Sequence, residues 1–213
     1  MTTVSGKDMT TVFACYLLGC FTAGYYWVRW RTGQDIRQEG SGNVGARNAG
    51  RILGATAFAA TLLLDLGKGA LAVGMTLYFG LRPEMVITAM LAVVVGHIWP
   101  MQLRFHGGKG IATSLGVLLA YDSVLLAILA AVFLPLFALS RNFTSSGLLA
   151  FALSPLLVFL CGLENMEVVA TSLLAIVILI SHRKNIREEF ARIFAPPLKD
   201  APTSGASDDD HEL

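Results

Sequence analysis

The sequence has 213 residues, of which 54% are hydrophobic and 15% are charged, and its formal net charge at pH 7 is +1. A soluble domain of this length would still need a charged surface, so the composition excludes an ordinary soluble enzyme. The basic residues are scattered over loops instead of gathering on one face, so no nucleic-acid partner is predicted. The cysteines lie within apolar stretches and match no metal-ligand spacing, so neither a metal site nor a disulfide framework is predicted.

Apolar stretches between short polar islands predict the membrane-spanning helices, since a spanning helix needs about 20 apolar residues. The first stretch, residues 10–28, is long for a cleaved signal peptide and has no basic start, so it is predicted to be a retained helix. Four further stretches predict one helix each: residues 52–80, 85–103, 147–162 and 165–181.

The stretch from Ile111 to Leu139 allows two interpretations. As one helix it would be about 45 Å long, against a hydrocarbon thickness of about 30 Å. Asp122 and Ser123 interrupt it near the middle. One tilted helix gives six spans in all, whereas two helices broken at Asp122 give seven.

The distribution of basic residues favours seven spans with the N-terminus outside. This topology places every basic loop residue inside except Lys7 and Arg82, as the positive-inside rule requires. Residues 110–121 are too short to cross alone and are expected to enter the membrane part-way. The sequence therefore predicts an all-α integral membrane protein with about seven transmembrane helices, some short, and Gly-rich cytoplasmic loops that form the site. Residues 1–195 are predicted to be one domain, and 196–213 a disordered polar tail.

The loop at residues 40–51, GSGNVGARNAGR, is rich in groups that bind an anion. Its glycines let the backbone adopt positive φ and present successive N–H groups to an oxyanion. Ser41, Asn43 and Asn48 add neutral hydrogen-bonding groups. Arg51 stands where the next helix is expected to begin, so a helix N-terminus and a guanidinium would favour negative charge together. The alternative is a flexible turn whose arginines only follow the positive-inside rule, and the composition alone does not decide.

A second loop, FHGGKG at residues 105–110, has the same character. Gly107 and Gly108 let the backbone close on a ligand, and Lys109 supplies a point charge suited to phosphate. The spacing is not that of a Walker loop. A basic turn at the membrane edge is the alternative interpretation.

Ionisable residues also lie within the predicted spans. Asp65 and Lys68 are three residues apart on one helix face, where a structural ion pair is slightly favoured over direct ligand contact. His97 is either a buried hydrogen-bonded histidine or a ligand contact, and Pro100 places it close to the loop that follows.

The segment SHRKNIR, residues 181–187, begins the last polar region. His182 and Asn185 are three residues apart and share a face that can turn inward, whereas the basic residues suit a helix lying on anionic lipid headgroups. The seven-span topology brings this segment, both Gly-rich loops and Arg141 to the same cytoplasmic face.

Four segments in this order and spacing resemble a known family: GSGNVGARNAGR, DLGKGALAV, GHIWPMQLRFHGGKGIATSLG and SHRKNIR. They are similar to the bacterial acyl-phosphate:glycerol-3-phosphate acyltransferases of the PlsY type, over roughly residues 10–195. The resemblance implies a seven-helix enzyme of the bacterial inner membrane with its site facing the cytoplasm. It also implies transfer of a fatty acyl group from long-chain acyl phosphate to the sn-1 hydroxyl of glycerol 3-phosphate, giving lysophosphatidic acid and phosphate. No cofactor is implied, and neither acyl-CoA nor acyl carrier protein is the direct donor.

The resemblance, together with the ionisable residues inside the spans, gives the predicted site. The predicted catalytic residues are Ser41, Arg51, Lys109 and His182. The predicted substrate-binding residues are Gly42, Asn43, Asn48, Lys68, His97, Gly107, Gly108, Arg141, Thr144 and Asn185.

Two departures from the family pattern affect this prediction. The family usually reads GSGNPGATN, so Val44 and Arg47 replace its proline and threonine here. The middle loop, commonly R-Y-x-S, reads RNFT and keeps Arg141 with Thr144 in place of the serine. Arg47 is either a substrate contact or a surface arginine.

The leading hypothesis is an acyltransferase that needs no covalent intermediate, because acyl phosphate is already activated. Arg51 and Lys109 would bind phosphate and stabilise the leaving group, while Ser41 would orient an oxyanion. His182 or a substrate phosphate oxygen would accept the hydroxyl proton. The rival mechanism makes Ser41 a covalent nucleophile. The rival classes are an organic-anion transporter, a divergent non-catalytic paralogue and a membrane scaffold.

Overall fold

A break at Phe21 and Thr22 divides the first apolar stretch of the computed structural model, which describes residues 4–194, into two helices. Helix α1 spans Gly6–Cys20 and α2 spans Ala23–Thr32. The prediction of one unbroken helix over 10–28 is therefore wrong, but Gly6–Thr32 still counts as one candidate span. At this break, the buried ammonium of Lys68 supplies hydrogen bonds that the N–H groups of a continuing helix would otherwise donate. Its Nζ donates to the carbonyl oxygens of Gly19 at 3.2 Å and Phe21 at 2.7 Å.

A short helix fills the second half of the predicted loop at 40–51. Helix α3 spans Ala46–Leu53, and α4 follows at once over Ala55–Tyr78. Gly54, at φ +87°, makes the corner between them. The expectation that Arg51 begins a helix is wrong, because Gly45 caps α3 and places Arg51 in its last turn. The short helix η1, Ile36–Gln38, precedes this segment.

The break predicted at Asp122 is confirmed. Helix α6 spans Ile111–Tyr121 and α7 spans Ser123–Ser140, and the Asp122 carboxylate accepts a hydrogen bond from the backbone N–H of Val124 at 2.7 Å, which caps α7. The remaining elements follow the predicted order. They are α5 (Pro83–Ile98), η2 (Met101–Leu103), α8 (Phe143–Leu160), α9 (Asn165–Ser181) and α10 (Arg183–Phe194).

The helices have the lengths of membrane spans. Among the described residues, five segments are long and apolar enough to cross: Gly6–Thr32, Ala55–Tyr78, Pro83–Leu103, Ser123–Ser140 and Phe143–Leu160. Taking α9 together with the helix that follows it gives a sixth. Helix α6 is apolar but shorter, as expected for a segment that does not cross alone. The all-helical membrane class is therefore confirmed, and the predicted seventh span is this short helix.

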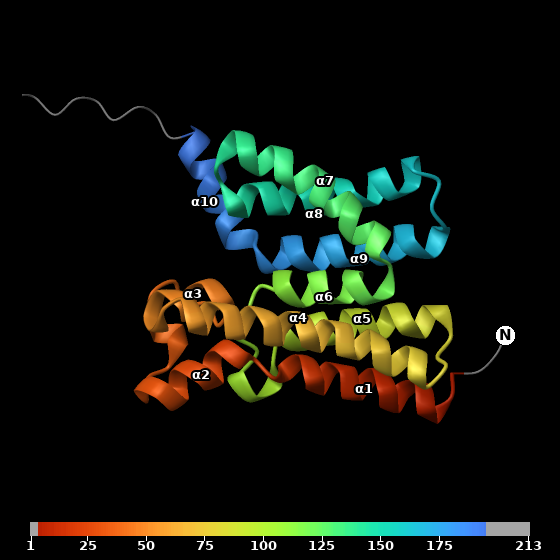
Figure 1. Cartoon of the computed structure of the whole chain (residues 1–213), viewed down its shortest axis with the longest axis horizontal. Coiled ribbons are helices and arrows are strands. Elements are labelled where there is room, and N and C mark those ends of the chain that lie inside the picture. Colours follow the sequence, from red (N-terminus) through yellow and green to blue (C-terminus); the bar gives the residue numbers. More distant parts are fainter. Residues whose placement is uncertain (1–3, 195–213) are drawn as a thin grey trace, which may run out of the picture. The chain divides into compact units, whose positions relative to one another are not determined.

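Small residues allow two pairs of helices to approach closely. A Cβ atom on Gly19 would overlap the backbone of Val93, which brings α1 against α5. A Cβ on Gly116 would likewise overlap the backbone of Leu66, which brings α4 against α6. Figure 1 shows these helices grouped together, with α6 between α4 and α9 and with α7 and α8 beyond α9.

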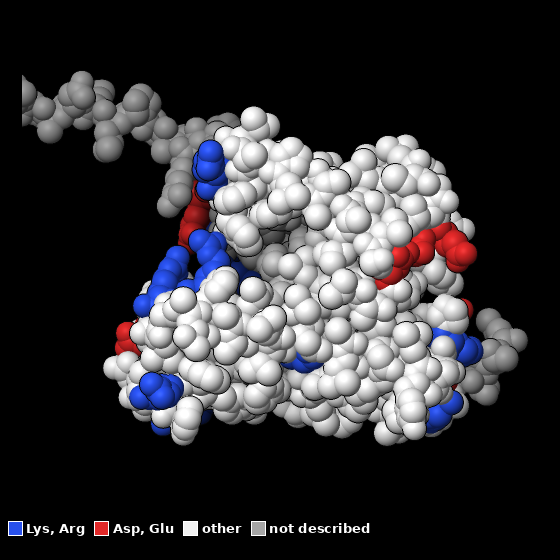
Figure 2. Space-filling view, in the orientation of Figure 1, with Lys and Arg blue, Asp and Glu red and all other residues white. Residues whose placement is uncertain are grey.

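The chain divides into two units, residues 1–183 and 184–213. The first holds α1 to α9. The second holds all of α10 except Arg183, and the predicted tail at 196–213 lies outside the described residues. Figure 2 shows a largely uncharged surface over α4, α6 and α7, with charged side chains toward the ends of these helices, as a bilayer requires.

Candidate functional site

The loop between α2 and α3, residues 33–45 and here called the first loop, is organised by one buried amide. Asn48 is 1% exposed and reaches back from α3. Its Nδ2 donates to the carbonyl oxygens of Ile36 at 3.2 Å and Glu39 at 2.9 Å, and its Oδ1 accepts from the backbone N–H of Ser41 at 2.9 Å. Asn48 therefore positions the loop that carries Ser41.

Glycines make this loop geometry possible. Gly40 and Gly42 have φ values of +57° and +69°, and a Cβ on Gly40 would overlap the Asn48 amide. The Gly42 N–H donates to the carbonyl oxygen of Glu39 at 3.0 Å. The N–H groups of Ser41 and Gly42 are thus engaged within the loop and are not available to a ligand in this conformation. The Ser41 residue itself is exposed.

An ion pair that the sequence analysis missed ties the first loop to the loop between α5 and α6. The Arg37 guanidinium forms two parallel hydrogen bonds to the Asp35 carboxylate, Nε to Oδ1 at 3.0 Å and Nη2 to Oδ2 at 2.6 Å. Its Nη1 donates to the carbonyl oxygen of Leu103 at 2.9 Å. The guanidinium lowers the pKa of Asp35 through these hydrogen bonds, and the carboxylate in turn raises the pKa of Arg37. The sequence pattern assigns this arginine only to the positive-inside set.

The second loop, residues 99–110 between α5 and α6, folds back onto the end of α5. The N–H groups of Gly107 and Gly108 donate to the carbonyl oxygens of Ile98 and His97, both at 3.0 Å. A Cβ on Gly108 would overlap the His97 ring. These glycines are therefore needed for contact between the loop and α5.

A buried cluster of polar side chains on α4 and α5 lies against this loop. Nζ of Lys68 lies 2.8 Å from Oδ1 of Asp65 and 2.7 Å from Nδ1 of His97. All three residues are at most 5% exposed. The predicted Asp65–Lys68 ion pair is confirmed, and His97 is hydrogen-bonded. Lys68 and His97 were also predicted to bind substrate, and this stays a prediction. Both are buried, and the His97 ring lies against Gly108.

The end of α9 joins the second loop at Lys109. The hydroxyl of Ser181 donates to the carbonyl oxygen of Lys109 at 3.0 Å, and His182 is the next residue. Nδ1 of His182 lies 2.9 Å from the carbonyl oxygen of Ile178. Because a carbonyl oxygen only accepts, Nδ1 carries the ring proton, which leaves the Nε2 lone pair as the acceptor. Two predicted catalytic residues are thus brought together.

Arg47 connects α3 to the start of α8. Its Nη1 donates to Oγ1 of Thr144 at 3.4 Å, and its guanidinium carbon lies 5.4 Å from the ring centroid of Phe143. Arg141, at φ +54°, caps the C-terminal end of α7, directly before the turn into α8. The GSGNVGARNAGR and RNFT segments therefore lie in contact, as the shared cytoplasmic face predicts. The contact is made by Arg47, which departs from the family pattern.

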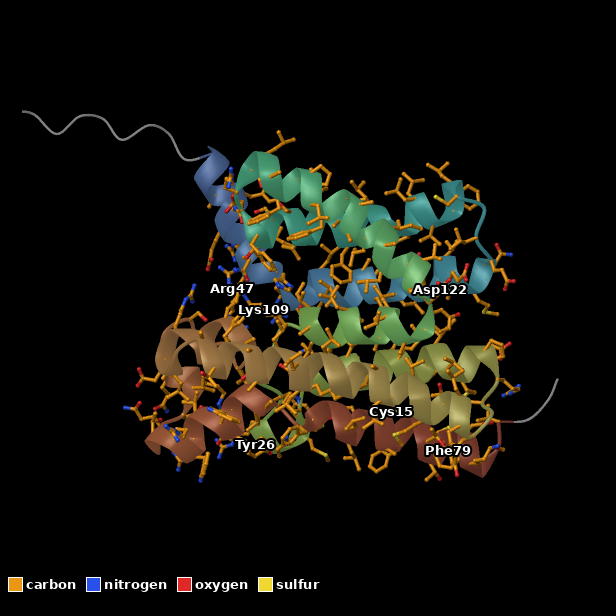
Figure 3. All side chains as sticks on the ribbon, viewed as in Figure 1. Cys15, Tyr26, Arg47, Phe79, Lys109 and Asp122 are labelled. Atoms are coloured by element: carbon orange, nitrogen blue, oxygen red, sulfur yellow. The ribbon has the colours of Figure 1, made fainter. Side chains whose placement is uncertain are left out.

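Figure 3 shows Arg47 and Lys109 at the same end of the helices, where the view in Figure 2 shows a hollow between the α4–α6 layer and the start of α8. No group of three or more metal-ligating side chains occurs within residues 4–194. Arg47 on α3 and Lys109 in the second loop are thus cations from separate segments at one end of the helices.

Three further predicted site residues differ in exposure and position. Asn43 is half-buried in the first loop. Arg51 is exposed on the last turn of α3. Asn185 lies on α10 in the second unit, so its place in the site stays a prediction.

Comparison with known proteins gives concordant results. Residues 9–192 match the family model described as glycerol-3-phosphate acyltransferase. Glycerol-3-phosphate acyltransferase 1 of Desulfitobacterium hafniense is 45% identical over 182 residues, which cover 85% of this chain and 90% of that protein. The protein of the same name from Bacillus anthracis is 40% identical over 176 residues, covering 83% and 93%.

Two crystal structures share the fold. The glycerol 3-phosphate form of PlsY (YgiH), an integral membrane glycerol 3-phosphate acyltransferase, superposes with a TM-score of 0.80 at 31% identity, covering 88% of this chain and 94% of that one. The lysophosphatidic acid form of the same enzyme gives a TM-score of 0.78 at 29% identity, covering 88% and 93%.

Proposed function

The chain belongs to the glycerol-3-phosphate acyltransferase family, and we propose that the first loop, α3, the second loop and the end of α9 form its active site. It is an integral membrane enzyme that acylates glycerol 3-phosphate to lysophosphatidic acid. The choice between enzyme, transporter, non-catalytic paralogue and scaffold is thereby made in favour of the enzyme. The acyl donor, the roles of the residues and the orientation in the membrane are the parts we propose.

The donor is a long-chain acyl phosphate. The sn-1 hydroxyl oxygen of glycerol 3-phosphate attacks the acyl carbonyl carbon, the bond from that carbon to the bridging phosphate oxygen breaks, and inorganic phosphate leaves. Both substrates carry phosphate, so the cationic side chains of Arg51 and Lys109 have suitable partners. Because the donor is already activated, orientation of the hydroxyl and stabilisation of the leaving phosphate supply the catalysis.

The proton of the attacking hydroxyl goes to Nε2 of His182. The observation that carries this proposal is the junction of α9 with the second loop. There the Ser181 hydroxyl holds the carbonyl of Lys109, and the Nδ1–H of His182 is donated to Ile178. A base with a fixed ring and an available Nε2 lone pair thus stands beside the loop that carries the phosphate-binding lysine.

Ser41 contributes a hydrogen bond and is not a nucleophile. Its N–H is held by Asn48, which fixes the residue at the exposed side of the first loop. A covalent mechanism would need a base beside its hydroxyl, and His182 is already assigned to the glycerol hydroxyl. Incubation with acyl phosphate alone, followed by mass spectrometry, should find no acyl group on Ser41. An acyl-Ser41 species that forms as fast as turnover would overturn this mechanism.

The decisive experiment compares donors with the purified enzyme in lipid nanodiscs. With palmitoyl phosphate and glycerol 3-phosphate we expect equal amounts of lysophosphatidic acid and inorganic phosphate. With palmitoyl-CoA as the sole donor we expect no product. Product from palmitoyl-CoA but not from palmitoyl phosphate would refute the proposed donor.

We place the active site on the cytoplasmic face of the inner membrane. The basic residues of both loops support this orientation through the positive-inside rule. A cysteine in place of Asp122 should react with an impermeant thiol reagent from outside intact cells, and one in place of Arg141 should react only after the cells are opened. Labelling of both positions from one side would contradict the orientation.

A further inference from the structure

An aromatic face on α7 and α8 borders the proposed site. Phe133 and Phe137 are one turn apart on α7 and stack with 5.6 Å between ring centroids. The ring of Phe143, at the start of α8, meets both of them edge-on at 5.2 and 5.9 Å. Phe143 is 45% exposed, and only 11% of the apolar window of α7 is buried. The face is therefore open to the acyl region of a bilayer.

The same face ends at a positive charge that comes from α3. The guanidinium carbon of Arg47 lies 5.4 Å from the Phe143 ring centroid, and Nη1 donates to Oγ1 of Thr144 at 3.4 Å. This hydrogen bond is long, its acceptor is neutral, and Arg47 is exposed. Within the first unit, residues 4–183, no carboxylate forms an ion pair with Arg47. The described residues of the first unit therefore leave the charge of this guanidinium without a counter-ion.

We propose that Arg47 and Thr144 bind the phosphate group of the acyl donor, and that Phe133, Phe137 and Phe143 contact the first part of its acyl chain. The inference rests on the proposed function and names the place where its donor binds. A guanidinium fork beside a hydroxyl matches the oxygens of a phosphate, and the adjoining aromatic face matches methylene groups. Glycerol 3-phosphate has no chain, so it gains nothing from a lipid-facing aromatic surface. The arrangement therefore selects an amphiphile with phosphate next to an acyl chain.

Arg47 departs from the usual family pattern. The family pattern that the first loop resembles has threonine where Arg47 stands. A threonine would offer a hydroxyl to phosphate but neither a charge nor a ring contact. Donor affinity in this enzyme therefore depends on a cation that the usual pattern lacks.

Steady-state kinetics of the full-length enzyme in phosphatidylcholine nanodiscs tests the proposal. Arg47→Ala should raise KM for palmitoyl phosphate about tenfold, roughly the loss of one charged hydrogen bond, and change KM for glycerol 3-phosphate by less than about twofold. Arg47→Lys should give an intermediate donor KM, because it keeps the charge but not the planar fork. Phe137→Ala should raise KM for palmitoyl phosphate more than KM for butyryl phosphate. Arg31→Ala is the matched control, since Arg31 also lies over an aromatic ring, that of Trp30 at 5.9 Å, and should leave both KM values unchanged.

A binding measurement separates this inference from the proposed reaction. Hexadecyl phosphate, which cannot transfer an acyl group, should raise the melting temperature of the wild type and of Arg31→Ala more than that of Arg47→Ala. Inorganic phosphate at the same concentration, or anionic phosphatidylglycerol in the nanodisc, should not reproduce the difference. Equal shifts in wild type and Arg47→Ala, a KM change confined to glycerol 3-phosphate, or the same difference with phosphatidylglycerol would each overturn the inference. If Arg47→Ala does not fold, Arg47→Gln and Phe137→Ala decide by the same two measurements. A wild type that binds hexadecyl phosphate through Arg47 but makes no lysophosphatidic acid would refute the reaction and leave the site intact.

Discussion

The amide of Asn48 holds the backbone of Ser41, with Oδ1 2.9 Å from the Ser41 nitrogen. The same amide donates to two carbonyl groups of the first loop, so one side chain on α3 fixes the loop in three places. The asparagine that resembles a substrate ligand in the sequence thus determines where the serine lies.

Asn48→Asp should abolish most activity. A carboxylate cannot donate to the carbonyl groups of Ile36 and Glu39, and it is buried beside them without a cation. Leaving these groups unpaired costs about 1–3 kcal/mol each, so we expect a lower melting temperature and a rate reduced by at least about 30-fold. Asn165→Asp, at an exposed position on α9, is the control and should behave as the wild type. An active, stable Asn48→Asp enzyme would show that the hydrogen bonds of the Asn48 amide are dispensable.

Lys109→Ala should remove a charged contact to phosphate. We expect a loss of about 2–4 kcal/mol of transition-state stabilisation, or roughly 30- to 1000-fold in rate. Lys7→Ala, which removes an exposed hydrogen bond to the carbonyl of Phe79, should retain normal turnover. The measurement is initial rate with palmitoyl phosphate, and near-normal turnover in Lys109→Ala would place this lysine outside the site.

Lys68→Met should destabilise the bundle more than a paired replacement does. The single change leaves the Asp65 carboxylate buried without its cation, and two carbonyl groups at the α1–α2 break lose their donor. Breaking a buried pair in this way costs about 3–5 kcal/mol, whereas replacing both partners by apolar residues is often close to neutral. We expect the wild type and the double variant Asp65→Leu/Lys68→Met to have a higher free energy of unfolding than the single variant Lys68→Met. The measurement is unfolding in mixed detergent micelles. The opposite order would mean that the ion pair is not what holds this region.

Gly108→Ala should displace the second loop. Its Cβ would overlap the His97 ring, which is itself held by Lys68, so the backbone must move. Gly147→Ala is the matched control, because a Cβ there meets no atom within 4 Å and alanine is the better helix former. We expect Gly108→Ala to lower kcat strongly, and Gly147→Ala to raise the melting temperature slightly. Equal activity of the two variants would show that the loop tolerates the shift.

The Asp35–Arg37 pair should make stability depend on pH at the acid end. The folded state lowers the pKa of Asp35 below its ordinary value of 3.8, so the charged form is the favoured one. The contribution is then fully present above that value and is lost as the pH falls through the lower pKa of the folded state. The melting temperature of the wild type should exceed that of Asp35→Asn by a constant amount at about pH 5 and above, roughly one unit over the ordinary pKa, and the gap should shrink on acidification. A gap that widens toward low pH would contradict the assigned sign.

The features that sequence reasoning found are those with a local periodic signal. Asp65 and Lys68 lie one turn apart on an apolar helix, and Asp122 interrupts an apolar run, so the ion pair and the break were both predictable. The α1–α2 break was not, because Phe21 and Thr22 carry no turn signal. The donor to the Phe21 carbonyl oxygen is Lys68, far away in the chain. The role of Arg37 was missed for a similar reason, since its partner Leu103 belongs to another loop.

The start of α3 shows a further limit of the sequence. The segment GSGNVGARNAGR reads as one loop, yet Gly45 ends the loop and begins a helix. The amide of Asn48 reaches the loop carbonyl groups of Ile36 and Glu39 from α3, and this long-range contact leaves no local pattern in the sequence. Resemblance to the family identified the segments, but not which of their residues face substrate and which hold the backbone.

The shortness of α6 determines how far Lys109 lies from the end of the helix bundle. Its 11 residues make a helix about 16 Å long, beside the 24 residues of α4, which extend over about 36 Å. Figure 1 shows that α6 leaves the α3 end of α4 uncovered, so Lys109, just before α6, is set back from that end of the bundle. If Lys109 binds substrate as proposed, a water-soluble acceptor must pass the uncovered end of α4 to reach it. The acyl chain of the donor can then stay among the apolar helices while its phosphate group meets the acceptor, so the reaction does not require drawing the chain into water.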